Sequence, residues 1–205
     1  MLIGNKYFFT HIPRTGGRYI SQLFIKNNYK CDMFKFENDF YDKIKNKKIH
    51  VPHLEYPYFL NFIHNKNILN FTVVRDPVDR FKSILKGYYG YYNKDMDKFN
   101  KKIKEIFLNF NEYVNSKIVT EQANWHVPQI NFIGSNTEIW FYEKGLGKNF
   151  IKWLYKKYGF TFSNIENINY DKGYYDDIDI DIILTKKQIK SIKDYYFKDY
   201  KIIYG

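Results

Sequence analysis

A short apolar stretch, Leu69–Val74 (LNFTVV), constrains the fold of this chain most strongly. It is rich in β-branched residues and has apolar side chains on both sides, as strands do when both of their faces are buried. Such strands lie in the middle of parallel sheets whose faces are covered by helices. Arg75-Asp76-Pro77 ends the stretch, and a helix is expected over residues 78–86.

Strands and helices alternate along the rest of the chain. Further strands are expected at Lys6–Thr10, Lys48–Val51 and Glu138–Tyr142. Further helices are expected at Arg18–Asn27, from Pro57 to about Asn65, and at Asn93–Ser116, Phe150–Tyr158 and Thr185–Phe197. This alternation predicts an α/β fold with a central parallel sheet flanked by helices, a doubly wound arrangement.

The length of 205 residues suits one domain, which we expect to span residues 1–205. Residues 93–135 are expected to form a helical lobe that covers the sheet. The segment Asn167–Asp181 is rich in Asn, Asp, Tyr and Gly, and it is expected to be a loop.

The amino-acid composition limits the cellular compartment and the binding partners that we expect for the protein. The single cysteine, Cys31, cannot form a disulfide framework or a thiolate metal site, which favours a reducing compartment. With no leader or spanning segment evident, we expect a soluble cytoplasmic protein. The net charge of +11 suits nucleic acid, an anionic membrane or a charged small substrate. Because the basic residues are dispersed, we expect the small substrate and neither nucleic acid nor membrane.

The first candidate site is the loop after the first strand, Pro13-Arg14-Thr15-Gly16-Gly17-Arg18, which leads directly into a helix. Glycines let the backbone approach an anion, and a helix start presents N–H groups and positive charge to it. Thr15 adds a hydroxyl, and Arg14 and Arg18 add guanidinium groups. The loop is therefore a candidate phosphate cradle, although a simple two-glycine turn is the alternative. It lacks the Walker A pattern.

The second candidate site follows Leu69–Val74. Arg75 at the strand tip and Ser83 on the next helix can together hold one phosphate, whereas pairing of Arg75 with Asp76 or Asp79 is the alternative. Parallel strands end at the same edge of a sheet, so both loops are expected there. Together they suggest a ligand with two separated phosphate groups.

These motifs resemble a known family. PRTGGR is similar to the 5′-phosphosulfate loop, P-K-T-G-G-T, of sulfotransferases that use PAPS (3′-phosphoadenosine-5′-phosphosulfate). VVRDPVDRFKS is similar to their 3′-phosphate motif, R-D-P-x-x-R-x-x-S. The likeness is to the carbohydrate-type branch, and it implies a P-loop-like three-layer fold.

The resemblance also implies roles for individual residues. Arg14, Thr15, Gly16, Gly17 and Arg18 would bind the 5′-phosphosulfate, and Arg75 and Ser83 would bind the 3′-phosphate. Arg14 stands where the family usually has a catalytic Lys that stabilises the leaving oxygen, and Arg18 stands where Thr or Ser is usual. PAPS would donate a sulfonate group to a hydroxyl or amine, with a carbohydrate as the expected acceptor and PAP as the nucleotide product.

Sulfonyl transfer needs a group that accepts the acceptor's proton. In the family that the chain resembles, a catalytic histidine follows the second strand, which implies His53 as the general base. His50 is the runner-up, and Glu55 is the alternative if both histidines point away. We expect no metal site, because no third ligand accompanies the two histidines.

Three other functions remain open at this point. An atypical P-loop kinase would need a loop lysine and a magnesium ligand, and neither is evident. A nucleic-acid- or polyanion-binding module would concentrate its basic residues on one face. A protein of the same fold could also bind the nucleotide without transferring sulfonate.

Overall fold

The computed structural model describes residues 1–32, 39–62, 68–90, 95–119, 123–165 and 181–205. These residues form two compact units. The sheet unit comprises Met1–Phe40, Ile49–Asp76 and Asn131–Asp171, and the helical unit comprises Tyr41–Lys48, Pro77–Ile130 and Lys172–Gly205. The lobe predicted over residues 93–135 is thereby divided at residue 130. Residues 167–180 of the predicted loop lie outside the described residues.

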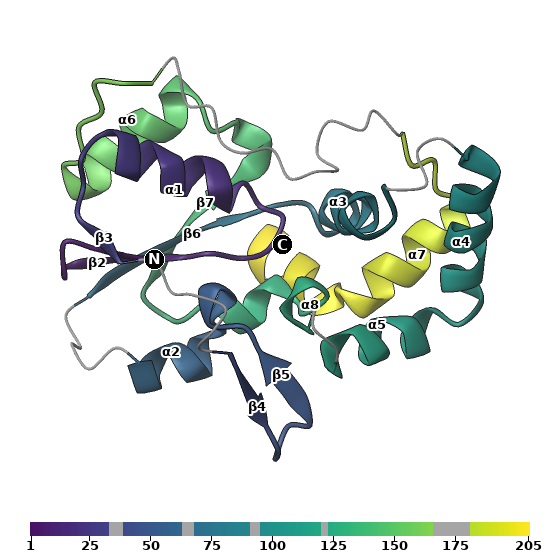
Figure 1. Ribbon diagram of the computed structural model, residues 1–205. Coiled ribbons are helices and arrows are strands. Elements are labelled where there is room, and N and C mark those ends of the chain that lie inside the picture. The colour runs from purple at the N-terminus through teal and green to yellow at the C-terminus, as the bar shows by residue number, and fades with distance from the viewer. Residues whose placement is uncertain (33–38, 63–67, 91–94, 120–122, 166–180) are drawn as a thin grey trace. The chain divides into compact units, whose positions relative to one another are not determined.

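A five-stranded sheet with the strand order β3-β1-β2-β6-β7 forms the centre of the sheet unit (Figure 1). The strands are β1 (Leu2–Ile3), β2 (Tyr7–Thr10), β3 (Cys31–Asp32), β6 (Leu69–Val74) and β7 (Thr137–Phe141). β6 lies between β2 and β7 and runs parallel to both, which confirms its predicted central place.

The sheet is mixed, so the prediction of a wholly parallel sheet is wrong on one side. β1 pairs antiparallel with both β2 and β3. A tight turn joins β1 to β2, with Gly4 and Asn5 at φ of 56° and 58°. Such a short connection can only produce an antiparallel pair, because a parallel pair needs a long crossover.

Helices cover both faces of this sheet, which confirms the predicted α/β class. The helices α1 (Gly17–Lys26) and α6 (Lys148–Tyr158) lie on one face, and α2 (Tyr56–Phe62) lies on the other (Figure 1). The strand β2 contributes to both cores, because Phe9 packs with the α1 and α6 side and Phe8 packs with the α2 side. Gly159 ends α6 in the left-handed conformation, at φ 75°.

The central strand β6 also buries polar side chains, and hydrogen bonds satisfy them. The Thr72 hydroxyl donates to the carbonyl oxygen of Thr10 (2.8 Å). The Asn70 amide donates to the Thr137 hydroxyl (3.1 Å) and accepts from the Thr10 hydroxyl (2.9 Å). These bonds tie β2, β6 and β7 together side by side.

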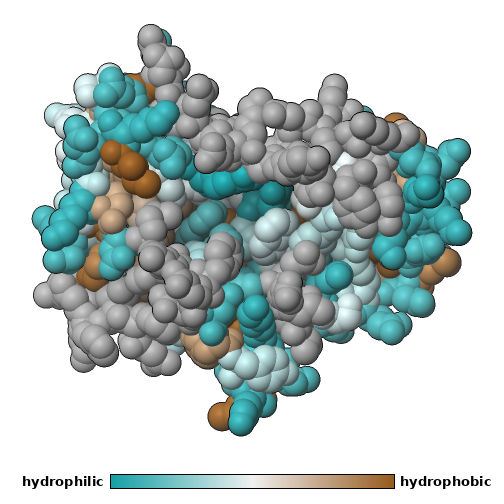
Figure 2. Space-filling model, viewed as in Figure 1, coloured by the Kyte–Doolittle hydropathy of each residue, from teal (hydrophilic) through white to brown (hydrophobic). Residues whose placement is uncertain are grey.

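The helical unit is built from α3 (Pro77–Tyr89), α4 (Met96–Leu108), α5 (Phe110–Val119), α7 (Lys186–Tyr195), α8 (Phe197–Asp199) and a final π-helical turn, Tyr200–Tyr204. The single helix predicted over Asn93–Ser116 is two helices, because Asn109 between them has non-helical φ and ψ of −128° and 51°. Thr185 is the N-cap of α7 and forms a capping box with Gln188. The surface over α4 is mainly hydrophilic (Figure 2).

A buried ionic arrangement organises the helical unit. The fully buried guanidinium of Arg80 donates to the carbonyl oxygens of Trp125 (2.8 Å) and Val127 (3.0 Å). The buried carboxylate of Asp199 accepts from the backbone N–H groups of Gln129 and Ile130, both at 2.9 Å. The two charged side chains thus hold residues 125–130 in place, and burial raises the pKa of Asp199.

The strand predicted at Lys48–Val51 does not belong to the central sheet. β5 (Lys47–Ile49) instead pairs with β4 (Phe40–Asp42) in a separate two-stranded sheet. A short 3₁₀ turn, Val51–His53, follows β5 directly. Within the described ranges, no helix has the length and apolar character needed to cross a membrane.

Candidate functional site

Three parallel strands of the sheet unit end side by side, and the residues that follow them form the candidate site. We call this region the carboxyl edge: residues 11–18 after β2, Arg75 and Asp76 after β6, and Tyr142 and Glu143 after β7. In α/β sheets this is the edge at which ligands bind. The expectation that the glycine loop and Arg75 meet at one edge of the sheet is confirmed.

The glycine loop is tightly wound and already ordered by its own contacts. Arg14 and Gly16 both have left-handed backbone conformations, with φ of 66° and 91°. The Thr15 side chain is fully buried, and its hydroxyl donates to the carbonyl oxygen of Ile12 (2.8 Å). Thr15 therefore holds the loop together in this structure, with its hydroxyl proton directed into the loop.

The second glycine allows the helix α1 to start against the end of β2. A Cβ atom at position 17 would lie 1.9 Å from the His11 ring. Gly17 is the first residue of α1, and the start of a helix carries N–H groups that have no partner within the helix. Arg18 follows on the exposed side of the same turn, so an anion here would meet both N–H groups and positive charge.

Arg75 lies against the glycine loop and against the residue that follows β7. Its Nη1 atom is 3.5 Å from the carbonyl oxygen of Arg14, and its guanidinium carbon is 4.7 Å from the ring centroid of Tyr142. A guanidinium stacked on a ring in this way keeps in-plane N–H donors for an anion. The structure thus brings Arg14 and Arg75 together, as the two motifs predicted.

The residues after β7 complete the carboxyl edge. A Cβ atom at Gly16 would lie 2.5 Å from a Leu146 methyl and 3.2 Å from the Tyr142 ring, so the loop rests directly on these side chains. The Glu143 carboxylate accepts from the backbone N–H of Asp76 (2.5 Å). The ends of β2, β6 and β7 are therefore mutually linked by side-chain contacts.

Two histidines lie beside the glycine loop. The Nδ1 atom of His53 is 3.0 Å from the carbonyl oxygen of His11, and the two rings meet edge to face at 4.4 Å. Because a carbonyl only accepts, His53 carries its proton on Nδ1 when neutral. Burial first, and then the charge of His53, lower the pKa of His11 well below its ordinary value. His11 is therefore a neutral spacer between Gly17 and His53.

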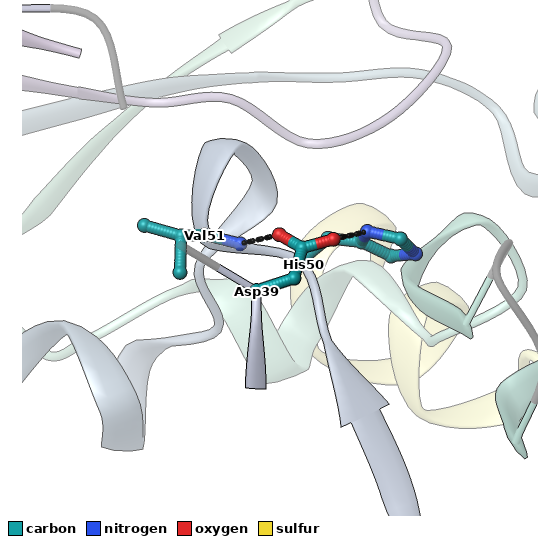
Figure 3. Close-up of polar contacts among 3 residues, drawn as sticks. All are labelled: Asp39, His50 and Val51. Carbon is teal, nitrogen blue, oxygen red and sulfur yellow. Dashed lines mark hydrogen bonds and ion pairs between the residues drawn. The ribbon is translucent and has the colours of Figure 1, made fainter. Parts of the chain in front are cut away.

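His50, the alternative base, is held by a carboxylate. Its Nδ1 atom is 2.5 Å from one oxygen of Asp39, and the other oxygen accepts from the backbone N–H of Val51 (2.9 Å), as Figure 3 shows. Asp39 therefore binds the start of the turn Val51–His53 as well as the His50 ring. Glu55, the remaining candidate base, is buried, and its carbonyl oxygen accepts from the N–H groups of Tyr58 and Phe59.

Ser83 is the one predicted ligand that the sheet unit does not contain. It lies half-buried on α3 of the helical unit, so its predicted role with Arg75 stays a prediction. Arg80, from the same motif, is a structural residue of that unit. In the described parts of the chain, no three His, Cys, Asp or Glu side chains gather as metal ligands do.

Sequence reasoning did not assign roles to Tyr142 or Asp39. Tyr142 could have been found, because it is the last residue of a predicted strand and so belongs to the edge at which parallel strands end. No local pattern marks Asp39, which precedes His50 by 11 residues.

The arrangement can bind an anion and accept a proton at neighbouring places. Arg14, Arg18, Arg75 and the start of α1 offer positive charge, and two imidazoles with a fixed tautomer lie on the adjoining turn. Comparison with known proteins adds no family: the chain matches no family model, no curated protein and no solved structure.

Proposed function

We propose that the protein is a sulfotransferase that moves the sulfonate group of PAPS to a hydroxyl or amine acceptor. The observation that carries the proposal is the contact of the glycine loop with Arg75, whose Nη1 lies 3.5 Å from the Arg14 carbonyl oxygen. A ligand with two phosphate groups would place one at the start of α1 and one near Arg75. We also propose that the α/β fold is of the P-loop-like type.

The chemistry is an in-line displacement at sulfur. The acceptor oxygen forms the new bond to sulfur, the bond from sulfur to the bridging oxygen of the 5′-phosphate breaks, and its electron pair leaves with the phosphate. Arg14 would stabilise that developing charge, with the N–H groups of Gly16, Gly17 and Arg18 beside it. Arg75 would hold the 3′-phosphate. The acceptor's proton passes to an imidazole of the turn that carries His50 and His53, with His53 as the base that the sequence predicts.

The charge and cysteine content support the rest of the proposal. A net charge of +11 suits anionic ligands, which favours a carbohydrate that itself carries acidic groups as the acceptor. A single cysteine fits a cytoplasmic location. The proposal includes no metal, nucleic acid or membrane.

Transfer of labelled sulfonate tests the activity. The protein is incubated with PAPS carrying labelled sulfur and a desulfated glycosaminoglycan, a simple alcohol, an aromatic amine, or water alone. We expect label to leave the nucleotide, and Arg75→Ala to lower kcat/KM by about 10-fold or more, the effect of losing charge-assisted hydrogen bonds.

Lys156→Ala is the matched control, because it removes one positive charge from the exposed last turn of α6 in the same unit. It should leave the rate unchanged. Complete retention of label on the nucleotide in every mixture, despite PAP binding, would contradict the transferase and leave a nucleotide-binding protein.

A further inference from the structure

The carboxylate of Asp39 gives His50 a negatively charged hydrogen-bond partner. Both side chains of the pair are almost completely buried, with 6% of His50 and 8% of Asp39 exposed. Each carboxylate oxygen has its own donor, the His50 ring and the Val51 N–H (Figure 3). The ring of His50 is thus fixed in orientation by a group that is itself fixed to the backbone.

This pairing determines which ring nitrogen can accept a proton. An ionised carboxylate only accepts hydrogen bonds, so Nδ1 of His50 is the donor and the neutral ring keeps its lone pair on Nε2. When Nε2 accepts a proton, the imidazolium forms beside a negative charge. That charge stabilises the protonated ring, and shielding from water strengthens the effect.

The Nδ1 atom of His53 makes a contact of a different kind. It faces the neutral carbonyl oxygen of His11, which fixes the tautomer and supplies only a partial charge. The His53 ring also meets the His11 ring, with the ring centroids 4.4 Å apart. A proton on His50 would be paired with the Asp39 carboxylate, whose oxygen lies 2.5 Å from Nδ1.

We infer that His50 accepts the acceptor's proton at Nε2 and that Asp39 is the residue that positions and polarises it. The inference rests on the proposed sulfonate transfer, and it requires the acceptor to reach Nε2, which is buried in this structure. As the oxygen–sulfur bond forms, the acceptor's proton moves to Nε2, the sulfonate leaves the 5′-phosphate, and the imidazolium later returns the proton to solvent. His53 then serves to hold the backbone of His11, beside the glycine loop.

Asp39→Asn tests the role of the carboxylate with little change in shape. The amide oxygen can still accept from the Val51 N–H, which turns the amide nitrogen toward Nδ1 of His50. Nδ1 must then accept, Nε2 carries the proton, and the ring cannot act as a base. We expect kcat for sulfonate transfer to fall by about 100-fold or more, with an unchanged KM for PAPS and an unchanged affinity for PAP.

Rescue by free imidazole tests His50 itself. His50→Ala should lose activity to a similar degree, and added imidazole should restore part of the rate. His53→Ala should gain nothing from imidazole. His50→Gln replaces the alanine variant if that variant does not fold, and thermal unfolding is measured for each protein.

PAP affinity, measured on every variant, separates the two hypotheses. If the wild type binds no PAP or transfers no sulfonate to any acceptor or to water, the proposed function fails and the inference fails with it. If transfer occurs and His50→Ala or His50→Gln retains the full rate, or imidazole rescues His53→Ala instead, the proposed function stands and the inference is wrong.

Discussion

A single buried histidine makes the stability of the protein depend on pH. His126 is fully buried among the rings of Phe81, Tyr88 and Tyr113, and within the described residues neither of its ring nitrogens has a hydrogen-bond partner. Burial, followed by nearby positive charge, lowers the pKa of His126 from 6.5 to about 3. The ring is therefore neutral in the folded protein.

His126→Phe should remove the part of the pH dependence that comes from this residue. The unfolded chain binds a proton at the imidazole near pH 6.5 and the folded protein only near pH 3, so the unfolded state binds more protons between these values. The free energy of unfolding of the wild type then falls as pH decreases below 6.5, by at most about 1.4 kcal/mol per pH unit from this residue. The variant also buries no unsatisfied nitrogen, so it should be at least as stable as the wild type at about pH 5.

Urea unfolding at about pH 7 and pH 5 measures both proteins. Other groups, including His11 and Asp199, contribute equally to each and cancel in the comparison. An equal loss of stability in the wild type and in His126→Phe would show that this histidine does not carry the effect.

The roles of some single residues could be predicted from the sequence, and the roles of others could not. Arg14, Thr15 and Arg75 could be selected from motifs, because their neighbours in the chain are part of the pattern. Arg80 belongs to the same motif as Arg75, yet it is buried and bonds to carbonyl oxygens 45 and 47 residues later. Such partners are fixed by tertiary packing, so no local pattern distinguishes this structural arginine from one that could bind a ligand.

At the scale of elements, the approach of α1 to β2 depends on Gly17. Gly17→Ala would place a methyl group 1.9 Å from the half-buried His11 ring, which must move. We expect a loss of about 1–3 kcal/mol in the free energy of unfolding, as for other overpacked sites. Urea unfolding at neutral pH measures the change.

Gly147→Ala is the matched control, because Gly147 precedes α6 as Gly16 precedes α1, and an added Cβ there meets nothing within 4 Å. It should be nearly neutral. Equal stability of the Gly17→Ala variant and the wild type would contradict the close packing of α1 against the end of β2.

Elements defined by local signals were predictable, and those defined by pairing were not. The predicted strands at 69–74 and 138–142 and the helix at 150–158 match β6, β7 and α6, because apolar patterns and a glycine cap mark them. The two-residue strands β1 and β3 carry too little pattern to detect. The partner of β5 could not be known either, since strand pairing is set by distant residues.

At the scale of the whole molecule, charge and topology favour the same kind of ligand. The chain carries a net charge of +11, and three of its arginines belong to the loops at the carboxyl edge: Arg14, Arg18 and Arg75. The topology places the ends of β2, β6 and β7 next to one another, so residues about 60 and 130 positions apart share one edge. The order of the motifs along the chain could predict this edge. The antiparallel strands on one side of the sheet could be recognised only from the structure.

Calorimetric binding of PAP is the most direct test of the proposed donor site. The wild type should bind PAP with a dissociation constant below the millimolar range. Arg75→Ala should weaken PAP binding by about 10- to 100-fold and should barely change the binding of 5′-AMP, which lacks the 3′-phosphate. Lys156→Ala should bind both nucleotides as the wild type does. A wild-type protein that shows no binding at millimolar PAP, or an Arg75→Ala variant that binds PAP unchanged, would contradict the account.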